Sequence, residues 1–72
     1  MITTHAGLKE RIAEALLEDP RTRDFAIEVI DDRGVVTLGG SVASEQVRQA
    51  AEMIVRQLPG VISVINTLRI RS

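Results

Sequence analysis

The segment Gly34-Val-Val-Thr-Leu-Gly-Gly-Ser-Val42 decides the fold of this chain, together with the two patterns that follow it. Its side chains are expected to point alternately to opposite sides, as in a β-strand. From Ser44 the apolar residues recur at three- and four-residue steps, which is helical spacing, and strand period returns after Gly60. This order of strand, helix and strand, with glycine at the joints, predicts a small α/β module.

A further strand is predicted before this segment, and residues 31–34 form the turn that joins the two strands. Gly34 is free to adopt the positive φ that a tight turn needs. The two strands are therefore expected to form an antiparallel hairpin. We expect Ile27, Val29, Val36, Leu38, Gly40 and Val42 on its inner side, and Glu28, Ile30, Val35, Thr37, Gly39 and Ser41 on its outer side.

Helical patterns precede and follow the hairpin. The first helix is expected to begin near Thr4, as N-cap, and to end near Glu18, because Asp19-Pro20 disfavours helical backbone. The second helix follows Ser44, as N-cap, and ends at Pro59-Gly60. The buried stripes are expected to be Leu8, Ile12, Ala15 and Leu16 in the first helix, and Val47, Ala50, Ala51, Ile54 and Leu58 in the second.

The opposite side of the second helix carries charges of alternating sign at three- and four-residue steps. This spacing predicts a solvated, salt-bridged surface rather than a binding site. The residues concerned are Glu45, Arg48, Glu52 and Arg56. Glu10, Glu14 and Glu18 line up along the first helix, where a solvated face is expected and a cation site is the alternative.

The last strand is predicted over Val61–Arg69. Because each helix has one apolar stripe, both helices should cover the same face of a single sheet. A strand–helix–strand unit with parallel strands is right-handed in nearly all proteins. The prediction is one α+β domain over residues 1–72, with two helices packed on one face of a three-stranded mixed sheet in the order αββαβ.

Composition excludes several classes of function. The chain has 72 residues, no cysteine, a net charge of −1 and a single aromatic residue, Phe25. It therefore has neither the basic patch nor the stacking platforms of a nucleic-acid binder. The amino terminus lacks a signal-peptide pattern and no apolar run is long enough to span a membrane. We expect a cytoplasmic protein as the sequence is written, or one module of a longer exported chain.

Taken in order, these elements resemble the BON domain, a family named for bacterial osmotically inducible and nodulation proteins. The resemblance covers nearly everything from Leu8 to Ile70. The matching residues are Asp19-Pro20, Ile27-Glu28-Val29, residues 34–42 in full, Ala50, Gly60-Val61, Val64, Asn66, Leu68 and Ile70. The resemblance implies the same αββαβ fold and a non-catalytic module that attaches to phospholipid membranes or binds proteins. It also implies potassium binding in one intracellular branch of the family.

The outer side of the sheet is the predicted contact surface. The residues expected on it are Ile30, Val35, Ile65, Thr37, Thr67 and Arg69. Scattered surface aliphatic residues are normal, whereas a contiguous patch marks a contact site. We expect a protein partner, either another domain or a second copy of the chain.

Two rival ligands remain open at this point. Anionic phospholipid is the first, and its headgroups would be contacted by Arg21, Arg23, Arg33, Arg69 and Arg71. Potassium is the second, since turns could supply the carbonyl oxygens it prefers. An anionic headgroup at the N-terminus of the second helix, near Ser44, is a further alternative.

Four residues of the family pattern have structural explanations. Gly34 supplies turn geometry, Gly40 is expected to permit close approach of helix and strand, and Gly60 allows the exit from the second helix. Asn66 lies among apolar neighbours on the inner side of the sheet. Its amide needs hydrogen-bond partners, so we expect it to hold a loop or a helix end, with a ligand role as the alternative.

Nothing in the sequence predicts catalysis, a metal site or a cofactor. Asp31 and Asp32 form a carboxylate pair, but they lie in a tight turn where aspartate is favoured for local backbone bonding. His5 has no second imidazole or cysteine with which to complete a metal site. A nucleophile with a matching base is not recognisable either.

Overall fold

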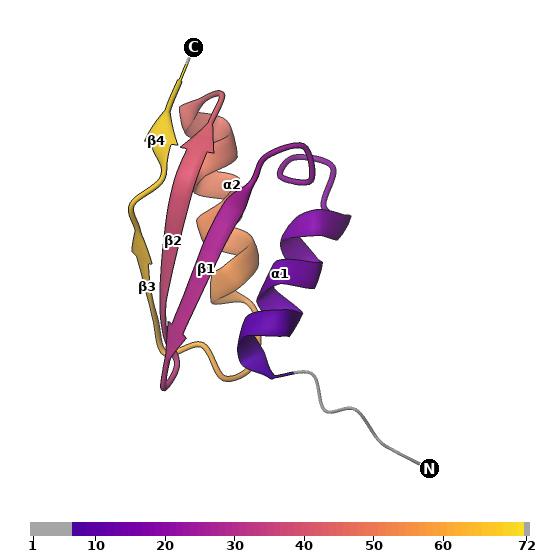
Figure 1. Ribbon diagram of the computed structural model, residues 1–72. Coiled ribbons are helices and arrows are strands. Elements are labelled where there is room, and N and C mark those ends of the chain that lie inside the picture. The colour runs from indigo at the N-terminus through magenta and orange to yellow at the C-terminus, as the bar shows by residue number, and fades with distance from the viewer. Residues whose placement is uncertain (1–6, 72) are drawn as a thin grey trace.

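The computed structural model describes residues 7–71 and has the predicted order of elements (Figure 1). The last strand differs from the prediction, because it begins at Ser63 rather than Val61 and is divided into two short pieces. The elements are α1 (Leu8–Glu18), β1 (Ile27–Asp32), β2 (Val35–Val42), α2 (Glu45–Arg56), β3 (Ser63–Asn66) and β4 (Arg69–Ile70).

Strand β2 is the centre of the sheet. It pairs antiparallel with β1 on one side and parallel with β3 on the other, which confirms the predicted mixed sheet. Strand β4 also pairs parallel with β2. Val35 pairs with Ser63 in β3, and Ser41 pairs with Arg69 in β4. The two residues of each pair are separated by the same number of residues in the sequence. Strands β3 and β4 are therefore two parts of one strand that keeps its register across an interruption.

Local hydrogen bonds explain this interruption. The backbone N–H of Leu68 donates to the side-chain Oδ1 of Asn66 at 3.1 Å, which is a turn of the kind that asparagine favours. Thr67 donates to the carbonyl of Leu38 twice, through its backbone N–H at 2.9 Å and through its hydroxyl. These bonds hold the strand against β2 where the regular ladder is absent.

In β2, opposite the interruption between β3 and β4, Gly40 has a φ of 118°, a conformation that residues with a side chain disfavour. A Cβ atom at this position would lie 2.6 Å from the carbonyl oxygen of Ala26. The expected reason for this glycine, close approach of helix and strand, is therefore wrong. The close approach is between β2 and the residue that leads into β1.

The hairpin turn has two residues in left-handed conformation, Arg33 with φ 53° and Gly34 with φ 93°. Positive φ at both central positions is the geometry of a type I′ turn, which matches the twist of the two strands. The N–H of Gly34 donates to the carboxylate of Asp31 at 3.0 Å. Asp31 thus has the local backbone bond that the turn predicts for aspartate.

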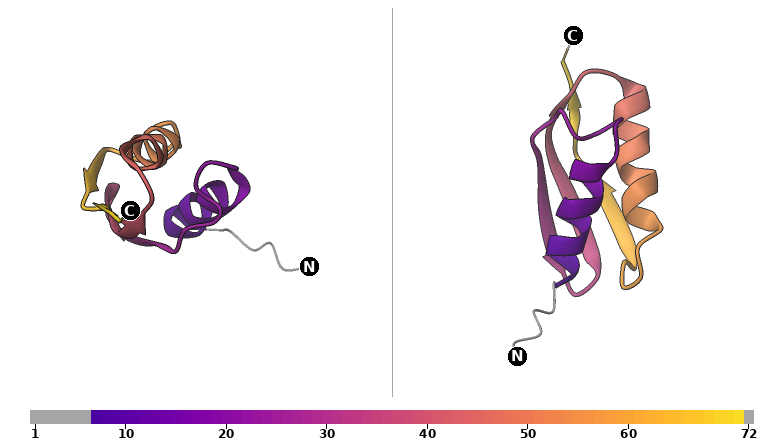
Figure 2. Two further views of the ribbon diagram at one scale, coloured as in Figure 1. Left: turned by 90° about the horizontal axis from the view of Figure 1, so that it is seen from above. Right: turned by 90° about the vertical axis from the view of Figure 1, so that its right-hand side faces the viewer.

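Both helices cover the same face of the sheet, as predicted (Figure 2). The first helical residue is Leu8, after Gly7, and Thr4 lies outside the described residues. The hydroxyl of Ser44 accepts the N–H of Val47 at 3.3 Å and so caps α2. Helix α2 ends at Arg56, so Leu58 packs on the core from the connection rather than from the helix.

The core lies between the helices and the sheet and is aliphatic. Val55, which we did not predict to be buried, is fully enclosed, whereas the predicted Ile54 is half-buried. Val55 lies four residues after Ala51 and eight after Val47, so the buried stripe of α2 continues at four-residue steps through Val55 instead of through Ile54. The buried hydrophobic residues are Ile12, Leu16, Val29, Val36, Leu38, Val42, Ala50, Ala51, Val55 and Leu68.

A buried threonine joins α1 to the rest of the fold. Thr22 is only 1% exposed, although it is a polar residue in the connection between α1 and β1. Its hydroxyl donates to the carbonyl oxygen of Leu16. Because the last carbonyls of a helix lack partners within the helix, this bond satisfies one of them and fixes the chain as it leaves α1.

Candidate functional site

The candidate site is the side of the sheet that faces away from both helices, which we call the outer sheet face. Strand alternation places on it the outward side chains of β1, β2 and the interrupted strand β3–β4. Its members are Glu28, Ile30, Asp32, Val35, Thr37, Gly39, Ser63, Ile65, Thr67 and Arg69.

The strand pairing aligns three of the predicted contact residues in one row across the sheet. Ile30 lies opposite Thr37, and Thr37 lies opposite Ile65. Ile30 is 61% exposed and Ile65 is 48% exposed. The half-buried Val35 lies in the next row, opposite Asp32 and Ser63. The apolar residues therefore lie in two neighbouring rows of the face, with Thr37 between Ile30 and Ile65.

A polar margin borders this row toward the β4 end of the sheet. Glu28 lies opposite Gly39, and a Cβ atom on Gly39 would be 3.8 Å from both Glu28 and Thr67. Arg69 lies beyond them, opposite Ser41. Within residues 7–71, neither Glu28 nor Arg69 forms an ion pair. Their charges are available to a partner.

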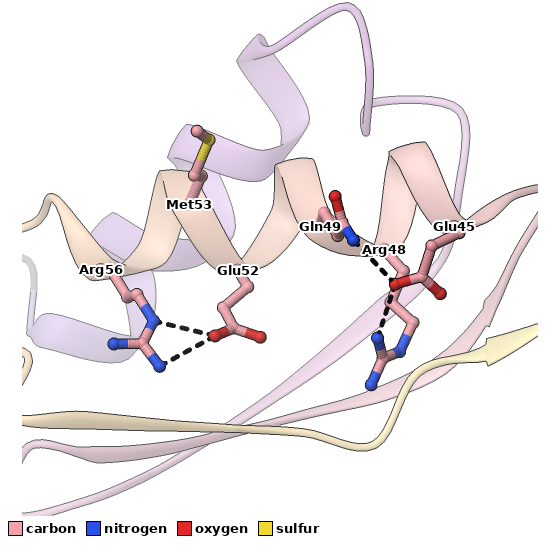
Figure 3. Close-up of a pocket in the computed structure, with 6 residues that line it drawn as sticks. All are labelled: Glu45, Arg48, Gln49, Glu52, Met53 and Arg56. Atoms are coloured by element: carbon pink, nitrogen blue, oxygen red, sulfur yellow. Dashed lines mark hydrogen bonds and ion pairs between the residues drawn. The ribbon is translucent and has the colours of Figure 1, made fainter.

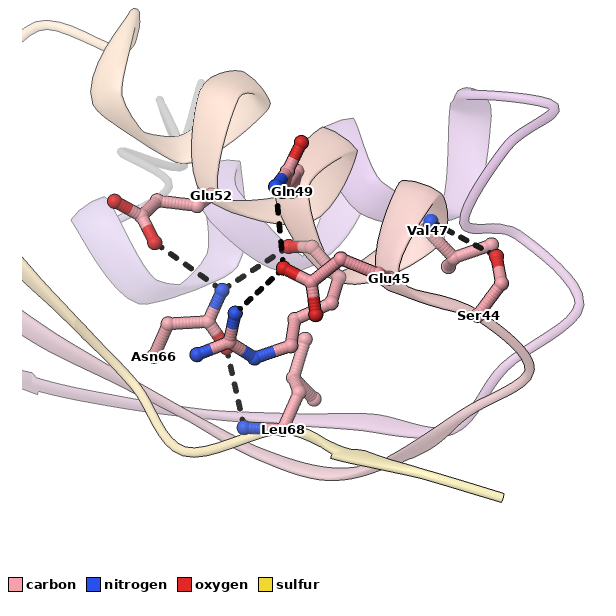
Figure 4. A network of polar contacts seen from close by, with 8 residues as sticks. Ser44, Glu45, Val47, Gln49, Glu52, Asn66 and Leu68 are labelled. Atoms are coloured by element: carbon pink, nitrogen blue, oxygen red, sulfur yellow. Dashed lines mark hydrogen bonds and ion pairs between the residues drawn. The ribbon is translucent and has the colours of Figure 1, made fainter. Parts of the chain in front are cut away.

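Asn66 lies on the opposite side of the sheet and points to α2 (Figure 4). Its amide nitrogen donates to the backbone carbonyl of Arg48 at 3.0 Å and to the carboxylate of Glu52 at 3.2 Å. Its oxygen accepts the N–H of Leu68. As expected, this side chain holds a loop, the connection between β3 and β4, and it also joins the middle of α2 to the last strand. The hydrogen bond from Asn66, assisted by Arg56, lowers the pKa of Glu52.

Replacement of Asn66 by alanine is expected to destabilise the fold by about 1–3 kcal/mol, because it removes three hydrogen bonds from part-buried groups. It should also raise the pKa of Glu52, since its largest stabilising contact is lost. Urea denaturation and an NMR titration of the Glu52 carboxyl measure the two effects. An unchanged pKa of Glu52 in the variant would show that the contact with Asn66 does not act on this group.

The polar side of α2 forms a shallow hollow of about 420 Å³ (Figure 3). Both of its arginines are engaged: Arg48 contacts Glu45 at 2.9 Å, and Arg56 contacts Glu52 at 2.9 Å. These are the predicted ion pairs of a solvated helix face, and such exposed pairs contribute little to stability. Met53 and Gln49 complete the lining.

The arginines expected at phospholipid headgroups divide between the two ends of the sheet: Arg21, Arg23, Arg69 and Arg71 lie in segments at the end where β1 begins, and Arg33 lies at the other end. Arg33 lies in the β1–β2 turn, at one end of the sheet. Arg69 and Arg71 lie beside Ser41 and Val42, at the other end of β2. Arg21 binds Asp19 through its side chain at 2.9 Å and through its backbone N–H. These contacts lower the pKa of Asp19 to about 2.

Two further features concern ligands and membranes. Among residues 7–71 there is no group of three or more histidine, cysteine, aspartate or glutamate side chains that could hold a metal ion. No helix in this part of the chain is both long enough and apolar enough to cross a bilayer.

Glu10, Glu14 and Glu18 are exposed along α1, as expected for a solvated helix face.

Comparison with known families agrees with this architecture. The family model of the BON domain matches residues 4–72, which is nearly the whole chain. No curated protein matches the chain significantly. With the αββαβ order, the mixed sheet and a match of this extent, the chain belongs to the BON domain family.

Proposed function

We propose that this domain is a non-catalytic interaction module that docks a protein partner on its outer sheet face. Membership of the BON domain family is consistent with a non-catalytic binding module. The observation that carries the proposal is the row of Ile30, Thr37 and Ile65, in which two large aliphatic side chains are exposed on the side that neither helix covers.

Burial of this row would favour association. Complete burial of an exposed isoleucine side chain yields about 1.5–3 kcal/mol, and Ile30 and Ile65 still have about half or more of their surface to bury. Apolar side chains bordered by a polar margin are the usual composition of a protein–protein contact.

The charge of the face favours a protein over an anionic membrane. Glu28 and Asp32 are both exposed on it, against a single base, Arg69. A bilayer rich in anionic lipid repels such acidic groups, whereas a protein partner can complement them.

Site-specific photo-crosslinking tests this proposal. A photoreactive phenylalanine analogue is placed at Ile65, and a control is placed at Met53, which is similarly exposed but lies on α2. In an extract of cells that naturally express the chain, we expect a defined protein adduct from position 65 that is lost when Ile30→Lys is added. Equal adducts from both positions, or an adduct that Ile30→Lys leaves unchanged, would refute docking on this face.

The two rival ligands are tested alongside. We expect no co-sedimentation with anionic phospholipid vesicles at low salt, and the same melting temperature in potassium chloride as in sodium chloride at equal ionic strength. A ligand that binds the native state raises its stability by mass action. Vesicle binding would replace the protein partner with a membrane, and a rise in melting temperature specific to potassium would indicate a cation sensor.

A further inference from the structure

We propose that the partner of the outer sheet face is a second copy of this chain, related by a two-fold axis that runs nearly parallel to β2. This inference rests on the proposed docking function of the same face. It is carried by the arrangement of the apolar row and of the charges around it, which are complementary to themselves under this symmetry.

The apolar row fits such a symmetry. A two-fold axis along the central strand places β1 of one copy over β3 of the other, with residues at equal heights. Ile30 of each copy then packs on Ile65 of the other, because both lie in the row through Thr37. Thr37 lies close to the axis itself. Each contact occurs twice, as in any two-fold interface.

The charges fit the same symmetry. Glu28 lies in the row of Gly39, so in the pair it faces Thr67 of the second copy, with Arg69 two residues further along that strand. Two residues of a strand span roughly 7 Å, a distance that an arginine side chain can cover. The pair therefore contains two equivalent Glu28–Arg69 contacts between groups that make no ion pair within the described chain.

The alternative face-to-face symmetry is unfavourable. A two-fold axis perpendicular to the strands and centred on the same row would place Glu28 over Asp32 of the second copy. Asp32 lies as many residues after Ile30 as Glu28 lies before it, and both are exposed acids on the outer sheet face. Like charges that face each other across an interface disfavour the pairing, so charge selects the axis along the strands.

The size of the face sets the strength of the pairing. Three strands spaced about 4.8 Å apart, with three or four rows each, give an area well below the roughly 800 Å² per partner of a standard interface. Association should therefore be weak and reversible, with a monomer in dilute solution and a dimer at high concentration.

Sedimentation equilibrium from micromolar to millimolar protein tests the proposal with matched charge variants. The unsubstituted chain should self-associate in this range. Glu28→Arg and Arg69→Glu should each weaken the association about tenfold, because both symmetric contacts change at once, and the double variant should restore it. Circular dichroism checks that all variants remain folded. A chain that stays monomeric at millimolar concentration, or a double variant as weak as the single ones, would overturn the proposal.

Cysteine crosslinking tests the position of the axis, since the chain has no cysteine of its own. A short bismaleimide should join two copies of Thr37→Cys but not of Ser63→Cys, which lies on β3, away from the axis. Preferential crosslinking of Ser63→Cys would overturn this geometry. Should the photo-adduct at position 65 contain a different protein while the chain stays monomeric, the docking function stands and the second copy is excluded. Absence of a face-specific adduct in the extract together with absence of self-association at millimolar protein removes both.

Discussion

Replacement of Leu38 by alanine is expected to lower the free energy of unfolding by about 2–5 kcal/mol, the range for buried leucine in well-packed cores. Leu38 is completely buried at the centre of β2 and packs in the single core cluster. A domain of this size has only a few kcal/mol of stability, so much of the variant should be unfolded at 37 °C. Urea denaturation followed by circular dichroism measures the loss.

The matched control is Ile65→Ala, which removes as many carbon atoms from the other side of the same sheet. Because Ile65 is 48% exposed, its replacement in dilute protein should lower stability by only about 1 kcal/mol. Similar losses for both variants would mean that the two faces of the sheet do not differ in burial, contrary to the structure.

Replacement of Gly40 by alanine is expected to destabilise the domain by about 3 kcal/mol or more. The backbone there has a φ of 118°, which costs a residue with a side chain on the order of 1–3 kcal/mol. In addition, the new Cβ would lie 2.6 Å from the carbonyl oxygen of Ala26, so β1 and β2 would have to separate locally. Thermal unfolding of the variant measures the combined effect.

The adjacent Gly39 provides the control for this prediction. Its φ is not positive, and a Cβ atom there would make ordinary contacts of 3.8 Å with Glu28 and Thr67. Gly39→Ala should therefore leave stability unchanged or raise it slightly, because alanine has less conformational freedom to lose. If the two alanine variants were equally stable, positive φ at Gly40 would not be required by the fold.

The fold could be predicted from the sequence because its signals are local. Alternation in 34–42 defines β2, and single apolar stripes place both helices on one face. Turn residues and helix stops fix the order of the elements. Each of these signals depends on residues close in sequence, where spacing alone decides which side chains share a face.

The features that the sequence did not predict depend on contacts between distant segments. Gly40 is required by the carbonyl of Ala26, and Thr22 is buried because it reaches back to Leu16. At the interruption of the last strand, Asn66 accepts the backbone N–H of Leu68, and Thr67 adds a side-chain bond to its backbone bond with Leu38. Helix or strand spacing cannot reveal such pairings, because they appear only when the chain is folded.

The outer sheet face combines both kinds of information. The alternation of side chains along each strand predicts that Ile30, Val35 and Ile65 point outward. Strand register, which is a tertiary property, then places Ile30 and Ile65 in the same row and leaves Val35 in the next. Register also determines the rows of the sheet in which Glu28 and Arg69 lie, and the proposed pairing depends on these positions.

The central claim is that both helices cover one face of the sheet and leave the outer sheet face open to a partner. Thiol labelling of two single-cysteine variants, Ile65→Cys and Val36→Cys, tests it most directly in dilute native protein, since Val36 is completely buried. Ile65→Cys should react nearly as fast as a free thiol, and Val36→Cys at least about a hundredfold more slowly, because it must wait for unfolding. Equal protection at both positions would contradict the account.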